Sequence, residues 1–158
     1  MNELEPVGRA RSGREVLIGF FPAWSDVLRL DLQRGAFVLF VVEDLPASAT
    51  RSPLSEAAHH LLDTGAVYVC AWCPRCRAIE DVFDWAAIDR DPDGRRPIIM
   101  TTSHAEESLE EAFDFAISFA QPADEYAESC RRVIGIFIGN VTRYHVIHEY
   151  CADALSGP

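Results

Sequence analysis

An apolar run of seven residues, AFVLFVV at 36–42, most constrains the fold of this chain. The run has the length of a strand, is rich in β-branched and aromatic residues, and carries no polar side chain on either face. Such a strand must be covered on both sides, as in a parallel sheet between helices. Further segments with strand character span residues 15–21, 66–71, 98–102 and 132–139.

Helical patterns separate these strands. They span residues 52–65, 74–88, 108–120 and 140–155. Because strands that alternate with helices favour a parallel sheet, we expect residues 14–158 to form a single doubly wound α/β domain. This domain would have about five mostly parallel strands with helices on both faces. Residues 1–13 are expected to be a mobile lead-in. Residues 25–33 are ambiguous between a helix that begins at Ser25 and a strand.

The charge of the chain limits the partners that it can bind. Its 158 residues carry a formal net charge of −11, with a pI near 4.8. This argues against nucleic acid, which needs a basic footprint, and against anionic lipid. No apolar run reaches the ~18 residues of a membrane helix, and the polar N-terminus does not resemble a secretory signal, so a cytoplasmic protein is expected. The charge suits solubility or attraction to a basic protein partner, and leaves the oligomeric state open.

Polar residues follow the expected strands and mark a candidate site. In a parallel α/β sheet, the loops after the carboxyl ends of the strands line the binding crevice. The binding residues predicted on this basis are Asp44, Trp72, Thr101, Thr102, His104 and Asn140. The alternative is that these residues are ordinary loop residues without a shared role.

A cysteine pair, Cys73-Pro-Arg-Cys76, lies between a strand and a helix. The positive end of the helix, together with Arg75 and Arg77, would favour a thiolate. The stretch AWCPRC resembles the active-site turn of the thioredoxin superfamily, which implies that Cys73 attacks and Cys76 resolves. The chain departs from that family because no proline precedes the strand at 132–139, where a cis-proline is expected.

Two further interpretations of the cysteines remain. A zinc site would use Cys70, Cys73 and Cys76, with His104 or His148 as the fourth ligand, but structural zinc usually has two paired ligand clusters. The cysteines would otherwise be small buried apolar residues. We therefore expect no metal, and the lack of a Gly-rich phosphate loop leads us to expect no cofactor.

A second resemblance covers roughly residues 65–140. The chain is similar to an uncharacterised bacterial domain family with Trp-Gly-x-x-Cys, His-Asp, Met-Thr-Thr-x-His and late Gly-Asn motifs. The matching positions are Trp72, Cys76, Asp81, Met100, Thr101, Thr102, His104, Gly139 and Asn140. Cys73 and Glu80 stand where this family would have glycine and histidine. The resemblance therefore implies that the cysteine pair is peculiar to this chain, and it carries no activity.

Taken together, the patterns favour a small acidic binding or accessory protein of immunity or regulator type, which acts through protein–protein interaction. They favour a role without catalysis but leave enzymatic activity open. An acidic ridge of Glu106, Glu107, Glu110 and Glu111 is one surface that a basic partner would meet. The alternative is a thiol–disulfide oxidoreductase that uses Cys73 and Cys76.

Overall fold

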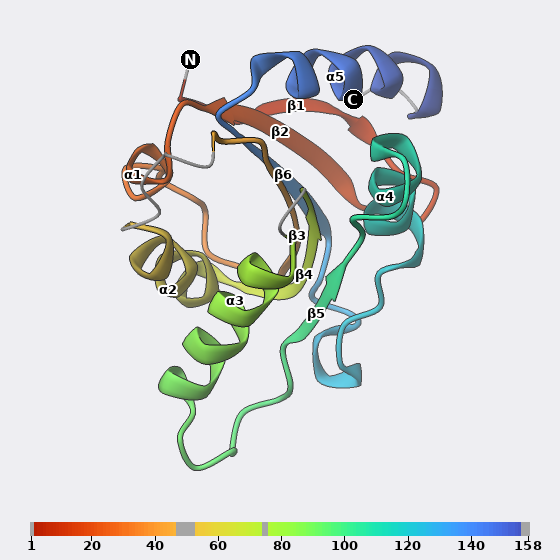
Figure 1. Ribbon diagram of the computed structural model, residues 1–158. Coiled ribbons are helices and arrows are strands. Elements are labelled where there is room, and N and C mark those ends of the chain that lie inside the picture. Colours follow the sequence, from red (N-terminus) through yellow and green to blue (C-terminus); the bar gives the residue numbers. More distant parts are fainter. Residues whose placement is uncertain (1, 47–52, 74–75, 156–158) are drawn as a thin grey trace.

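A six-stranded sheet forms the centre of the protein, in a computed structural model that describes residues 2–46, 53–73 and 76–155 (Figure 1). The strand order is β1-β2-β6-β3-β4-β5. The strands are β1 Glu5–Arg9, β2 Glu15–Phe21, β3 Phe37–Glu43, β4 Ala66–Trp72, β5 Met100–Ser103 and β6 Arg132–Ile138. β1 is antiparallel to β2, whereas the five other strands are parallel to one another. The predicted mostly parallel α/β sheet is thus confirmed.

Helices cover both faces of the sheet (Figure 1). One face packs against α1 Trp24–Val27, α2 Leu54–Thr64 and α3 Cys76–Arg90. The other packs against α4 Leu109–Asp114, the π-helical turn η1 Phe115–Phe119 and α5 Val141–Ala154. A short 3₁₀ turn, η2 Asp124–Tyr126, precedes β6. The apolar side chains therefore form two cores, one on each side of a shared sheet.

The apolar run at residues 36–42 forms most of β3, near the middle of the sheet. Its side chains alternate between the two cores, as the period of two in a strand requires. Phe37, Leu39 and Val41 lie in the core under α1 to α3, and the intervening Val38 and Phe40 lie in the core under α4 and α5. Every residue of β3 is buried, which explains why the strand contains no polar residue before Glu43 at its end.

The sheet has one strand more than expected, because β1 lies within the predicted lead-in. Residues 5–9 pair with β2, so the expectation of a mobile lead-in is wrong for them. The sequence pattern of this strand was weak because Pro6 and Gly8 interrupt the apolar alternation. The pairing of β1 with β2 is also irregular between these two residues. β2 and α5 supply the contacts that hold this edge strand.

Several element boundaries also differ from the expectation. The ambiguous segment 25–33 contains the single turn α1, which begins one residue before Ser25, and no strand. Its Leu30 and Leu32 are nevertheless buried in the core beneath α2. The predicted helix at 108–120 begins at Leu109, where Ser108 caps it. Residue 52, expected at the start of a helix, lies outside the described residues.

Among the described residues, none of the helices combines the length and the apolar character that a bilayer crossing requires.

We expect the core under α4 and α5 to be sensitive to loss of Phe40. This ring is fully buried, with its centroid 5.6 Å from that of Phe113 and 6.2 Å from that of Phe137. Phe40→Ala should lower the free energy of unfolding by ~3–5 kcal/mol, because it leaves a cavity beside the rings of Phe113 and Phe137. Phe119→Ala is the control, since that side chain is 68% exposed. Urea unfolding of both variants measures the difference, and equal losses would contradict this packing.

Candidate functional site

At the carboxyl ends of β3 and β6, a carboxylate and an amide meet. Asn140 Nδ2 donates a hydrogen bond of 2.8 Å to Asp44 Oδ2, and Arg143 Nε donates to the same oxygen at 3.3 Å. Gly139 allows this approach, since its φ of +88° is unfavourable for other residues and a Cβ there would lie 2.6 Å from Leu45. Asn140 Oδ1 also accepts from Thr142 N and so caps α5.

Arg143 extends this contact to the end of β4. The centre of its guanidinium lies 5.0 Å from the centroid of the Trp72 ring, a cation–π contact. Trp72 Nε1 in turn donates to the main-chain oxygen of Glu107 at 2.9 Å. The loop before α4 is therefore tied to the end of β4 and, through Arg143, to α5.

His104 continues the same network after β5. Its side chain is only 6% exposed and stacks on Phe115 at 4.7 Å between centroids. Nδ1 donates to Glu107 Oε1 at 2.9 Å, since a carboxylate only accepts, and Nε2 pairs with the Thr102 hydroxyl at 2.8 Å. Both nitrogens of the imidazole are thus engaged with neighbouring side chains.

These contacts join seven residues into one chain of interactions, which we call the edge network. Its members are Asp44, Trp72, Thr102, His104, Glu107, Asn140 and Arg143. Five of the six predicted binding residues belong to it. The sequence argument missed Glu107 and Arg143 as members, because only the fold brings the start of α4 and the first turn of α5 to this edge.

Thr101, the sixth predicted residue, lies on the other side of the sheet. Its Oγ1 donates to Asp84 Oδ1 of α3 at 2.7 Å. Neighbouring side chains of a strand point to opposite faces, so Thr101 and Thr102 cannot both join one site above the same face. The expectation that both threonines line one pocket is therefore wrong.

The two cysteines of the Cys-x-x-Cys sequence also lie on the α3 side. Both are 2% exposed, and Cys76 Sγ donates to the main-chain oxygen of Cys73 at 2.7 Å. A hydrogen bond from the Cys73 side chain lowers the pKa of Cys76. The thioredoxin resemblance instead assigns the attacking thiolate to Cys73. Residues 74 and 75 lie outside the described residues, so the structure gives no account of the predicted effect of Arg75.

The other three cysteines are buried thiols. Burial raises the pKa of Cys70 and of Cys151 to about 12 in each case, and also raises the pKa of Cys130. All five cysteines are among the described residues, and no disulfide joins them. Within the described part of the chain, His, Cys, Asp and Glu side chains form no group of three or more arranged to hold a metal ion.

Two pockets lie at opposite ends of the strands. One of about 600 Å³ adjoins the edge network and is lined by Cys76, Ser103, His104 and Glu107, among others. The other, of about 740 Å³, lies where β3 and β4 begin and is lined by the ends of α2 and α3 and by the loop that leads to β5. The sequence argument missed this second pocket because it considered only the loops after the carboxyl ends of the strands.

Residues 21–154 match the family model described as Domain of unknown function (DUF7684). The chain belongs to the DUF7684 family. The match includes the edge network, the cysteine pair and both pockets, whereas β1 and all but the last residue of β2 precede it. The predicted membership of an uncharacterised domain family is confirmed. A comparison with curated proteins found no match.

The double role of Asn140 in this DUF7684 chain can be tested by substitution. Asn140→Ala should lower the free energy of unfolding by ~1–2 kcal/mol, because it removes the cap of α5 and the donor to Asp44. Asn140→Asp keeps the capping oxygen but places a second carboxylate beside Asp44. Repulsion raises the pKa of one carboxyl in the folded state, so this variant should lose stability relative to wild type as the pH rises from ~4 to ~7.

Urea unfolding at several pH values measures both effects. If Asn140→Asp showed the same deficit throughout this range, the proposed contact with Asp44 would be contradicted.

The lowered pKa of Cys76 predicts a pattern of alkylation. Iodoacetamide should modify Cys76 of the DUF7684 chain with an apparent pKa below the ordinary 9.0, and Cys73→Ala should raise that value by removing the hydrogen bond. Cys70 and Cys151 serve as internal controls that stay unmodified near neutral pH. Peptide mass spectrometry across pH measures each site, and a Cys76 profile that Cys73→Ala leaves unchanged would count against this contact.

Proposed function

We propose that this DUF7684 chain is a binding protein that recognises a protein partner along the open edge of β5. The observation that carries this proposal is an edge strand flanked by exposed apolar side chains. β5 pairs with β4 on one side, and within the described part of the chain no strand pairs with its other side. Unpaired N–H and C=O groups of such an edge can accept a strand from a partner.

Large apolar side chains surround this edge. Trp85 and Ile88 on α3 are 66% and 56% exposed, and Ile98 and Met100, before and within β5, are 68% and 39% exposed. We call these four residues the β5 patch. The hydrogen bond from Thr101 to Asp84 ties β5 to α3, which fixes α3 beside this edge. Met100 lies on the same face of the sheet as Thr102, opposite to α3, so the patch flanks the edge on both faces. Exposed apolar side chains gathered on adjoining elements support a protein contact.

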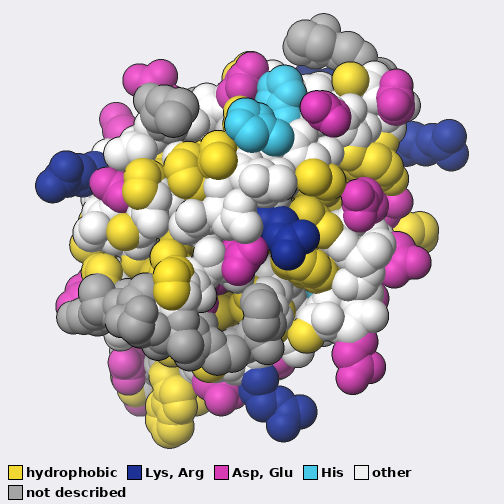
Figure 2. Space-filling model, turned by 45° about the horizontal axis from the view of Figure 1, so that its top comes forward, with side chains coloured by type: hydrophobic (Ala, Val, Ile, Leu, Met, Phe, Trp, Pro, Cys, Tyr) yellow, Lys and Arg dark blue, Asp and Glu magenta, His cyan; other side chains and the backbone are white. Residues whose placement is uncertain are grey.

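The distribution of acidic residues favours a general attraction of basic partners. It does not favour docking on one acidic ridge. Figure 2, with the α5 side turned forward, shows acidic side chains spread around the face rather than gathered in one patch. In the predicted ridge, Glu107 is engaged by His104 and Glu111 accepts from Ser108 N at 3.0 Å to cap α4. The net charge of −11 would still steer a basic protein toward this chain.

The arrangement of the edge network favours a structural role at that end of the sheet. Its imidazole, amide and guanidinium each pair with a carboxylate, and these contacts hold the loops after β3, β5 and β6. A non-enzymatic accessory or regulatory protein, of the immunity type among others, fits these features. We place it in the cytoplasm.

Thiol–disulfide exchange is the second candidate function. The hydrogen bond that lowers the pKa of Cys76 favours it, because a thiolate is the reactive form of cysteine. The two thiols are only 2% exposed, so exchange with another protein would require the surrounding loops to open. The alkylation experiment above separates this function from simple burial.

Substitution of the β5 patch tests the leading proposal. Ile98→Glu should abolish binding of the partner, because it places a charge in the apolar contact. Phe119→Glu is a matched control, since Phe119 is also 68% exposed but lies on η1, outside the patch. Affinity capture of the tagged chain from its native cells, with quantitative mass spectrometry, compares wild type and both variants.

A partner at this edge would be captured by wild type and by Phe119→Glu, and lost with Ile98→Glu. Capture that decreases in high salt would further support a basic partner, because salt screens surface charges. The proposal fails if Ile98→Glu captures the same proteins in the same amounts as wild type, or if wild type captures none above background.

A further inference from the structure

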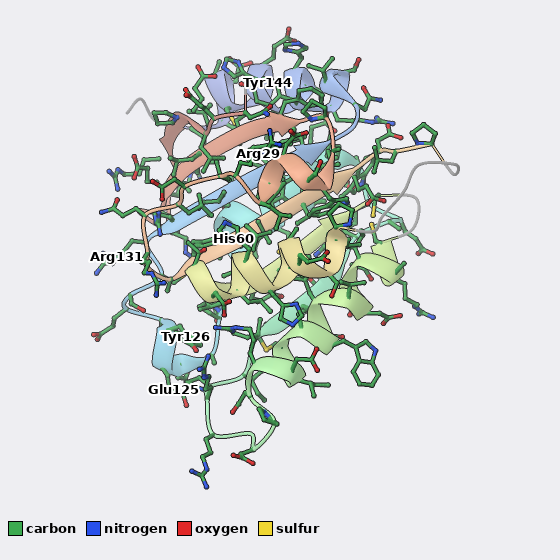
Figure 3. All side chains as sticks on the ribbon, turned by 90° about the vertical axis from the view of Figure 1, so that its left-hand side faces the viewer. Arg29, His60, Glu125, Tyr126, Arg131 and Tyr144 are labelled. Carbon is green, nitrogen blue, oxygen red and sulfur yellow. The ribbon has the colours of Figure 1, made fainter. Side chains whose placement is uncertain are left out.

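A cavity at the amino ends of β3 and β4 has the size and lining of a small-molecule site. We call it the arginine pocket, after Arg34, Arg90 and Arg96 in its wall. Its volume of about 740 Å³ falls within the range of ~300–1,000 Å³ that is typical of ligand sites. Figure 3 shows Tyr126, another wall residue, on η2 at the end of the molecule that also carries the loop between α3 and β5.

The wall of the arginine pocket provides apolar surface for the body of a ligand. Leu62 on α2 and Ala87 on α3 pack into the core beneath the pocket, and Ile99 lines it from the loop before β5. Ile88 and Ile98 belong both to this wall and to the β5 patch, and both are more than half exposed. A ligand with an apolar body would remove this surface from water.

Three aspartates also line the pocket, and each of them accepts at least one hydrogen bond from the protein. Asp63 Oδ1 accepts from Arg90 Nε at 2.6 Å, and Asp84 Oδ1 accepts from the Thr101 hydroxyl at 2.7 Å. Asp91 accepts from the main-chain N–H groups of two successive residues, at 2.9 Å each, and so shapes the loop after α3. Part of the acceptor capacity of these carboxylates is therefore already used within the protein.

The arginines of the pocket keep most of their N–H donors without a protein acceptor in the described part of the chain. A guanidinium has five N–H donors, and the structure records only the Nε bond of Arg90, although its side chain is 17% exposed. Its four Nη hydrogens have no recorded acceptor in residues 2–46, 53–73 and 76–155. The same holds, across these described ranges, for the whole guanidinium groups of Arg34 and Arg96. Most N–H donors of these three guanidinium groups are thus open to a ligand or to water.

We propose that the arginine pocket binds a small carboxylic acid with an apolar body. The carboxylate accepts hydrogen bonds from the Nη groups of Arg90, because the planar fork of a guanidinium matches the two oxygens of a carboxylate. Arg34 and Arg96, both exposed, add positive charge at the pocket. The apolar body lies against Leu62, Ala87 and the isoleucines of the wall. This inference does not depend on the proposed protein partner, because it concerns the chain alone.

Isothermal titration calorimetry of the full chain with defined probes tests the inference. The probes are octanoate and 2-naphthoate as apolar acids, octanol as the uncharged analogue of octanoate, and inorganic phosphate as an anion without an apolar body. We expect at least one of the two acids to bind, and octanol and phosphate to bind ~10-fold more weakly or worse, because each lacks one half of the recognised chemistry.

Substitutions assign the binding to the pocket. Arg90→Gln and Arg96→Gln should each weaken binding of the acid, by ~10-fold for Arg90, which makes the closest contacts. Arg96 is exposed and its side chain has no recorded bond in the described residues, so its variant keeps the test valid if Arg90→Gln disturbs folding. Arg29→Gln is the matched control, because Arg29 is also exposed and lies away from Tyr126 in Figure 3.

Circular dichroism confirms that each variant is folded before titration. Three results would overturn the inference: no binding of either acid at millimolar concentration, octanol that binds as tightly as octanoate when octanoate binds, or phosphate that binds as tightly as the acid that binds. An acid whose affinity drops as much with Arg29→Gln as with Arg96→Gln would place its site elsewhere and would also overturn it.

Discussion

Burial of β3 on both faces is the constraint on which the rest of this structure depends. A strand without polar side chains in its first six positions must be covered twice, and the chain meets this demand with α1 to α3 on one side and α4, η1 and α5 on the other. Once the two layers are in place, all loops after the parallel strands meet at one end of the sheet. The edge network therefore lies at the carboxyl ends of the parallel strands. The arginine pocket lies at the opposite end, where β3 and β4 begin.

The two ends differ in how their polar groups are used. At the carboxyl end, carboxylate, amide, imidazole and guanidinium side chains pair with one another, so that they hold three loops together. At the amino end, the aspartates are paired whereas arginine donors are left over. Arg90 carries this argument, because its side chain is only 17% exposed and a part-buried donor without an acceptor costs free energy. Its four Nη hydrogens have no recorded acceptor in the described residues, which indicates a ligand more strongly than the closed network at the other end does.

Much of the architecture could be predicted because it follows from local patterns. The apolar runs located β2, β3, β4 and β6, and Asn140 marked the start of α5. β1 was missed because Pro6 and Gly8 obscure its alternation, and it is stabilised by β2 and α5 rather than by its own composition. For the site, strand ends pointed to Asp44, Trp72 and His104, but not to Arg143, which comes from a helix packed beside them.

The sequence by itself determined that this chain forms a layered α/β fold, because hydrophobic periodicity is a property of neighbouring residues. It also determined the excess of negative charge, which is a sum over residues. Only the tertiary structure decided that Thr101 bonds to Asp84 of α3, that Arg143 reaches Asp44 and Trp72, and that Arg34 shares one pocket with Arg90 and Arg96. Those properties depend on distances between residues that are far apart in the chain, and such distances exist only once the helices have packed on the sheet.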